Sequence, residues 1–153
     1  MIIGLRPEDA QKFSLPKPRT KKVSVGESLV DLMESKGWPG ARQWALNAAR
    51  IAPTLVGGSK KHGGADLGPT RAKLQWAELG VDGMGVANEP PDACRPIEFF
   101  PRLTIRMAAR IQGFPDNWIF TGKKTNEYRQ IGNAFPPPVA AYIGRAIHRA
   151  IKK

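Results

Sequence analysis

A glycine-rich basic segment carries the densest set of hydrogen-bond donors in this sequence of 153 residues. Glycines at positions 57, 58, 63 and 64 enclose the donors, and glycine lets a backbone approach another molecule closely. Lysine usually contacts phosphates, whereas serine, histidine and arginine also suit base edges. The segment and the residues after it therefore predict contact with nucleic acid through Ser59, Lys60, Lys61, His62, Thr70 and Arg71. A solvated basic loop is the alternative.

Other chemistries fit this composition less well. Gly58 and Gly63 have the spacing of a phosphate-binding P-loop, but Gly64 follows where that loop needs lysine. The run Gly83-Met84-Gly85 lacks the third glycine of a dinucleotide-binding fingerprint. His62 has only the distant His148 as a second histidine, so no metal site is predicted.

Cys94 is the single cysteine, which excludes an internal disulfide and a cysteine-rich zinc site. It lies between Ala93 and Arg95 in an acidic stretch, residues 76–101, which holds five acidic side chains and one arginine. That setting favours a spectator thiol over a nucleophile, because a reactive thiolate needs electropositive surroundings. The sequence predicts no catalytic residue in this chain.

Helices and loops must position the donors. The apolar run 1–6 fits a short buried strand, and the prolines and lysines that follow it indicate a linker. Ser24 and Glu27 have the spacing of a capping box, which predicts a helix that ends at Gly37. A second helix is expected over 39–50. Residues 53–75, rich in glycine, predict a strand end and a long loop.

Two further helices are expected toward the C-terminus. Thr104 is a suitable N-cap for a helix of about two turns that ends at Gly113. Met107 occupies the position of the usual acidic cap partner, so a one-sided cap is expected, half of the usual reciprocal pair. A last helix should begin near Pro138. It has an apolar stripe that needs a packing partner: Val139, Ile143, Ile147 and Ile151.

Size and charge set the class of protein. The chain is long enough for one domain or one part of a larger one, and its net charge of +11 is typical of proteins that bind polyanions. No apolar run reaches membrane-span length and no secretory signal opens the chain, which favours a cytoplasmic protein without membrane contact.

Two stretches resemble the last two motifs of the bacterial DNA (cytosine-5) methyltransferases. The first is Arg102-x-Thr104-x-Arg106 followed by Gln112-Gly113-Phe114-Pro115, and the second is Gly132-Asn133-Ala134. Thr54-Leu55 resembles a pair found in the recognition domains of this family. The resemblance extends over the whole chain.

The resemblance implies a fold and a set of site residues. The expected fold is α+β: a small mixed target-recognition domain with short strands and long loops over residues 1–101, and a C-terminal motif region over 102–153. Its last helix would pack on a doubly wound catalytic domain. Arg102, Thr104, Arg106 and Arg110 would help to hold double-stranded DNA, although Arg106 and Arg110 share a helix face and one of them can form an internal ion pair instead. Gly132, Asn133 and Ala134 would line part of a pocket for S-adenosylmethionine.

Family motifs that perform the chemistry are missing from the sequence. It has no Phe-x-Gly-x-Gly, no Pro-Cys-Gln nucleophile, no Glu-Asn-Val and no Gln-x-Arg-x-Arg. The family flips a cytosine and attacks it with that cysteine, so this chain alone is expected to be inactive. A separate chain that carries the catalytic domain is the expected partner, and a truncated remnant is the second possibility.

Two readings from other classes remain open. One is a stand-alone DNA-binding or regulatory module derived from such an enzyme. The other is a basic RNA-binding protein, which is disfavoured because the sequence has no aromatic stacking motif. The sequence does not determine the DNA target or whether a restriction enzyme accompanies the chain.

Overall fold

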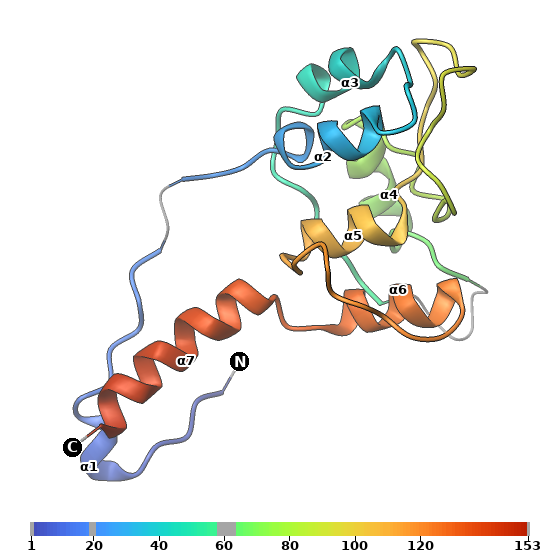
Figure 1. Ribbon diagram of the computed structural model, residues 1–153. Coiled ribbons are helices and arrows are strands. Elements are labelled where there is room, and N and C mark those ends of the chain that lie inside the picture. The colour runs from blue at the N-terminus through green and yellow to red at the C-terminus, as the bar shows by residue number, and fades with distance from the viewer. Residues whose placement is uncertain (1, 19–20, 58–63, 153) are drawn as a thin grey trace.

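A computed structural model describes residues 2–18, 21–57 and 64–152. Within these residues the secondary structure consists of helices: α1 (Pro7–Ala10), α2 (Val25–Glu34), α3 (Ala41–Asn47), α4 (Thr70–Ala77), α5 (Ile105–Ile111), α6 (Lys124–Asn133) and α7 (Pro137–Ile151). Helices α2 to α6 gather into one body, while α7 extends away from it beside the N-terminal segment (Figure 1).

The body is built on one apolar core. Helix α2 packs against α3 and α5, and α5 packs against α6. Three tryptophans are buried in this core, Trp38, Trp44 and Trp76, and the first two donate indole hydrogen bonds to backbone carbonyl groups. The core draws residues from both sides of position 101, so residues 1–101 and the first C-terminal motif support each other.

Ser24 begins α2 as its spacing predicts. Its side chain accepts a hydrogen bond from the Glu27 amide at 3.1 Å, and the Glu27 carboxylate accepts one from the Ser24 amide at 2.7 Å. The helices predicted near 39–50, 104–113 and 138–151 are also confirmed. The packing of α7 on a doubly wound domain stays a prediction.

Short strands are absent from the described residues, which contain only isolated bridges such as Ala87–Thr104. The apolar run after Met1 is not a buried strand, because residues 2–6 have no ladder partner and Ile2 is 98% exposed. Whether the recognition domain is a mixed α+β fold therefore remains an expectation.

Two helical segments differ from the prediction. Helix α4 begins at Thr70, so the expected loop is shorter than 53–75, because residues 70–77 are free of glycine and proline. Helix α6 was not predicted at all. It contains Gly132 and Asn133, poor helix formers, but Tyr128 and Ile131 are buried in the core and hold it in place.

None of the described helices is both long enough and apolar enough to cross a membrane.

Candidate functional site

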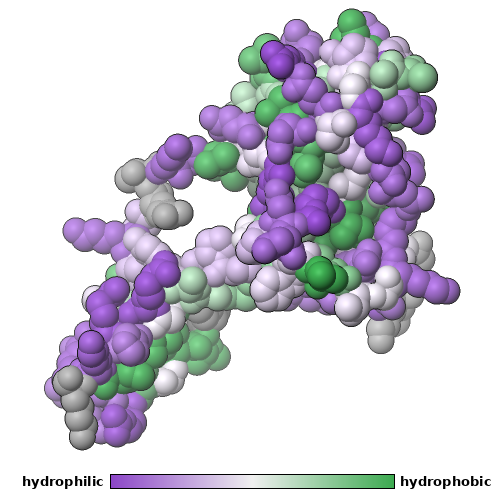
Figure 2. Space-filling model, viewed as in Figure 1, coloured by the Kyte–Doolittle hydropathy of each residue, from purple (hydrophilic) through white to green (hydrophobic). Residues whose placement is uncertain are grey.

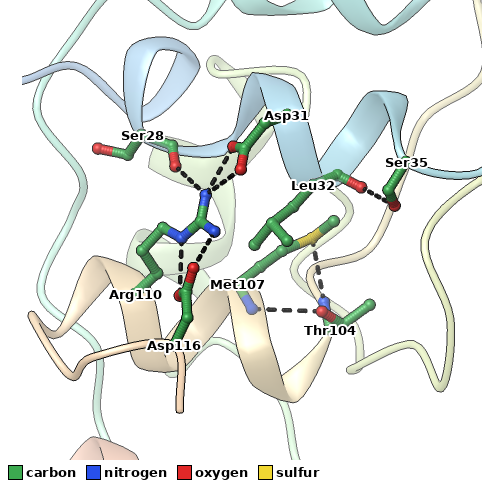
Figure 3. A network of polar contacts seen from close by, with 8 residues as sticks. All are labelled: Ser28, Asp31, Leu32, Ser35, Thr104, Met107, Arg110 and Asp116. Carbon is green, nitrogen blue, oxygen red and sulfur yellow. Dashed lines mark hydrogen bonds and ion pairs between the residues drawn. The ribbon is translucent and has the colours of Figure 1, made fainter.

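Helix α5 presents the first group of predicted site residues. Thr104 caps it: the Thr104 hydroxyl accepts from the Met107 amide at 3.2 Å, and the Met107 sulfur lies 3.4 Å from the Thr104 amide (Figure 3). The expectation of a one-sided cap is wrong, because a thioether is a weak acceptor that completes the reciprocal pair. Thr104 is 6% exposed, so its hydroxyl serves the helix.

Arg110 lies at the centre of an ion-pair network that joins α5 to α2. One terminal nitrogen donates to both carboxylate oxygens of Asp31, at 2.6 and 2.8 Å, and to the Ser28 carbonyl at 3.1 Å (Figure 3). Its Nε and its other terminal nitrogen each donate a hydrogen bond to one oxygen of the Asp116 carboxylate.

The charges in this network stabilise one another. Hydrogen bonds from Arg110 hold the pKa of the Asp31 and Asp116 carboxyl groups below the ordinary value, and bonds to Asp116 and Asp31 raise the pKa of Arg110. Of Arg106 and Arg110, it is therefore Arg110 that forms the internal ion pair. A contact between Arg110 and DNA would require these bonds to open.

The other arginines of this motif are more available. Arg102 donates to Asp82 at 2.7 Å but keeps about half of its side chain exposed. Arg106 is exposed and has no ion pair within the part of the chain that the structure describes. It lines a hollow of about 410 Å³ with Trp118 and Glu127. Arg106 is thus the arginine of the three best placed to meet a phosphate.

The basic segment is described only at its edges. Ser59, Lys60, Lys61 and His62 lie outside the described residues. Thr70 is the first residue of α4 and Arg71 is exposed on it. Their contacts with DNA remain predictions.

The Gly132-Asn133-Ala134 run is brought against the residues that precede the basic segment. Gly132 and Asn133 end α6, and Gly132 lies on the backbone of Val56 and Gly57. Gln112 donates from its side chain to the Ala134 carbonyl at 2.7 Å, which fixes the connection to α7. Gly132, Asn133 and Ala134 and the stem Val56–Gly57 form what we call the cofactor turn, after the cofactor contact that the sequence motif predicts for it.

A hollow of about 640 Å³ adjoins the cofactor turn, within the usual size range of small-molecule sites. Its walls come from several elements. They are Val25 and Ser28 of α2, Thr54 and Leu55, Arg110 of α5 with Gln112 at the end of that helix, and Gly132, Ala134 and Pro136. Asn133 is not part of this wall, since its carboxamide lies against Gly57. Backbone and amide groups here can bind the polar groups of a small molecule.

Gln112 belongs to a motif in the sequence that indicates no role for its side chain, and no pattern in the sequence indicates the contact of Gly57. A glutamine side chain bonded to a carbonyl 22 residues away leaves no local signal. Cys94 is exposed, and no group of metal-binding side chains occurs among the described residues.

Comparisons with known proteins agree with the motifs. The family model of the C-5 cytosine-specific DNA methylases matches residues 1–149. Type II methyltransferase M.NaeI of Lentzea aerocolonigenes is 57% identical over 152 residues, which are 99% of this chain and 37% of that protein. M.NgoMIV of Neisseria gonorrhoeae is 45% identical over all of this chain and 49% of its own length.

The chain thus spans between about a third and a half of the length of these two relatives. No solved structure gives a significant match. Since the family model covers nearly the whole sequence, the chain belongs to the C-5 cytosine-specific DNA methylases.

Proposed function

We propose that this chain is the DNA-recognition and cofactor-pocket-completing portion of a DNA (cytosine-5) methyltransferase that acts in the cytoplasm. The observation that supports this most is the cofactor turn. It joins the stem of the basic segment to Gly132 and Ala134 beside a hollow of about 640 Å³. The basic segment that would contact DNA and the hollow that would bind a small molecule would then both be positioned by the cofactor turn.

S-adenosylmethionine is the proposed cofactor, and it supplies the methyl group of the reaction. Gly132 and Ala134, which line the hollow, would border it through their backbones. The Asn133 carboxamide, which can both donate and accept hydrogen bonds, would reach it from its place against Gly57, next to this wall. The hollow is partly open to solvent in this chain, and we propose that residues of the catalytic portion complete the site.

DNA would be held by cations on the body. Arg106 and Arg71 are exposed, and Arg102 is half exposed. Phosphate contacts from such side chains set the position of the duplex, while the loop that contains Ser59 and His62 would read bases. The target cytosine must leave the stack before any attack on its ring.

The catalytic groups are proposed to come from a separate chain or another segment that docks on α7. A groove of about 470 Å³ runs between α7 and the N-terminal segment. It is lined mainly by apolar side chains, among them Leu15, Val139, Tyr142 and Ile143. Figure 2 shows hydrophobic residues gathered on this lobe. Such a surface is typical of a protein interface.

The test is transfer of labelled methyl from S-adenosylmethionine to DNA. It compares this chain alone, the polypeptide encoded immediately upstream alone, and the two together. We expect activity only in the mixture. Activity of this chain alone would contradict the assignment of catalysis to another part.

A stand-alone DNA-binding module is the second candidate, and the continuous core of the body favours it, because that core draws on this chain alone. The same assay separates the two. DNA binding without methyl transfer in any mixture would favour the module.

A further inference from the structure

The cofactor turn contains a contact between two glycines that are 75 positions apart. A Cβ built on Gly132 would lie 2.6 Å from the Cα and the N of Gly57. A Cβ built on Gly57 would lie 2.5 Å from Cγ and 2.9 Å from Nδ2 of Asn133, and nearer still to Oδ1. The stem of the basic segment therefore touches both the backbone and the side chain of the end of α6.

Space, and not backbone conformation, calls for glycine at these two positions. The glycines with positive φ are at other places, Gly37, Gly64, Gly68, Gly80, Gly113 and Gly122. Alanine at 57 or 132 would thus keep an allowed backbone. What it would lack is room for one methyl group.

The two glycines differ in what a methyl group would displace. At Gly132 it would meet backbone atoms of Val56 and Gly57, so the two segments would have to separate. At Gly57 it would meet only the end of the Asn133 side chain, which can rotate away. Substitution at Gly57 should therefore move the Asn133 carboxamide and leave the fold in place.

The stem has its own support. Val56 packs on Gly68, where a Cβ would lie 2.8 Å from the Val56 methyl group. The segment that contains Gly68 is itself held in place: the Leu67 amide donates to the Gly83 carbonyl at 3.0 Å, and Lys73 forms an ion pair with Asp66 at 2.7 Å. Gly57 is buried and cannot easily yield to Asn133.

From this geometry we infer that Gly57 is a positioning residue for the cofactor site: its bare backbone is the surface against which the Asn133 carboxamide is set. The inference rests on the proposed function, in which Asn133 borders S-adenosylmethionine. It makes a residue of the recognition segment necessary for cofactor affinity without touching the cofactor.

A double-mutant cycle on the assembled enzyme tests it. We expect Gly57→Ala and Asn133→Ala each to raise the dissociation constant for S-adenosylmethionine about tenfold. The double variant should bind it no more weakly than Asn133→Ala alone, because the carboxamide that Gly57→Ala displaces is gone. Fully additive losses would overturn the inference.

Matched measurements separate folding from positioning. Gly4→Ala is the control, since a Cβ there meets nothing within 4 Å. In the isolated chain, Gly57→Ala should shift the side-chain amide NMR signals of Asn133 and leave most other signals unchanged, whereas Gly4→Ala should not move them. Unshifted Asn133 signals would also overturn the inference.

The outcomes distinguish this inference from the proposed function. If Asn133→Ala leaves cofactor affinity unchanged, the cofactor role of Asn133 fails, and the role of Gly57 fails with it. If Asn133→Ala weakens binding and Gly57→Ala does not, only the inference about Gly57 fails.

Discussion

Arg110 uses all three guanidinium nitrogens within the protein. Two of them donate hydrogen bonds to the Asp116 carboxylate, and the third donates to Asp31 and to the Ser28 carbonyl. One side chain thus joins α5, the turn after it and α2. The planar guanidinium has donors in a fixed geometry that can bind two carboxylates at once, whereas a lysine ammonium is a compact point charge without this geometry. The identity of this residue should therefore matter more than its charge.

We expect Arg110→Lys to lower the free energy of unfolding by about 1–2 kcal/mol, a value reduced because both carboxylates are more than half exposed. Denaturant titration measures it. Arg42→Lys is the control, since Arg42 forms a largely exposed ion pair with Glu34 and should change stability by less than about 0.5 kcal/mol. Equal effects of the two substitutions would contradict a special role for the network.

The pH dependence of the same variant follows from the depressed pKa of Asp31 and Asp116. A carboxyl group with a lowered folded pKa stabilises the fold above its ordinary pKa, and this stabilisation is lost as the pH falls through the folded value. The advantage of arginine should thus be complete above about pH 5 and shrink below about pH 4.

Spacing alone could not tell which arginine is held internally. Positions 102, 106 and 110 recur at helical spacing, and this predicted one internal ion pair without choosing between Arg106 and Arg110. The choice depends on Asp31, which is 79 residues from Arg110 in sequence and arrives through the packing of α2 on α5. Residue types predicted a candidate site, and tertiary contacts decided the partners.

At the scale of elements, the cap of α2 is the feature most directly encoded. We expect Ser24→Ala to lower the free energy of unfolding by about 1 kcal/mol, because the Glu27 amide loses its acceptor. Ser28→Ala is the matched control within the same helix. Arg110 uses only the backbone carbonyl of Ser28, so this change should cost nothing measurable. A comparable loss from both changes would contradict the cap.

Helices with a local start signal were predictable, and helices held by tertiary contacts were not. Ser24 and Thr104 mark α2 and α5 through their own neighbours. Helix α6 has no side-chain cap and includes Gly132, so its formation depends on burial of Tyr128 and Ile131. The residues Gly132 to Ala134 were predicted from their motif, but their contact with Gly57 was missed for the same reason, since no local pattern shows that Gly57 meets Gly132.

The whole molecule exposes more surface than a compact protein of its size. Its accessible surface is 10115 Å², whereas a folded monomer of 16.8 kDa is expected to expose about 7,700 Å². The lobe of α7 and the N-terminal segment lies apart from the body (Figure 1). Apolar side chains stay open there, including Leu15, Val139 and Ile151.

That lobe can be tested without disturbing the body. Val139 is 44% exposed and lines the groove. Val139→Asp should therefore leave the free energy of unfolding of the isolated chain nearly unchanged, and its dissociation constant for DNA within about twofold of the native value. If the groove receives the catalytic portion, a buried unpaired carboxylate at its centre should reduce methyl transfer by the mixture at least about tenfold.

The control is Ala140→Asp on the same helix, which makes the same change of charge at an exposed position that does not line the groove. It should impair assembly far less, as measured by sedimentation of the mixture. Normal assembly and methyl transfer with Val139→Asp would show that the catalytic portion docks elsewhere, because no interface of useful strength buries an aspartate at its centre without loss.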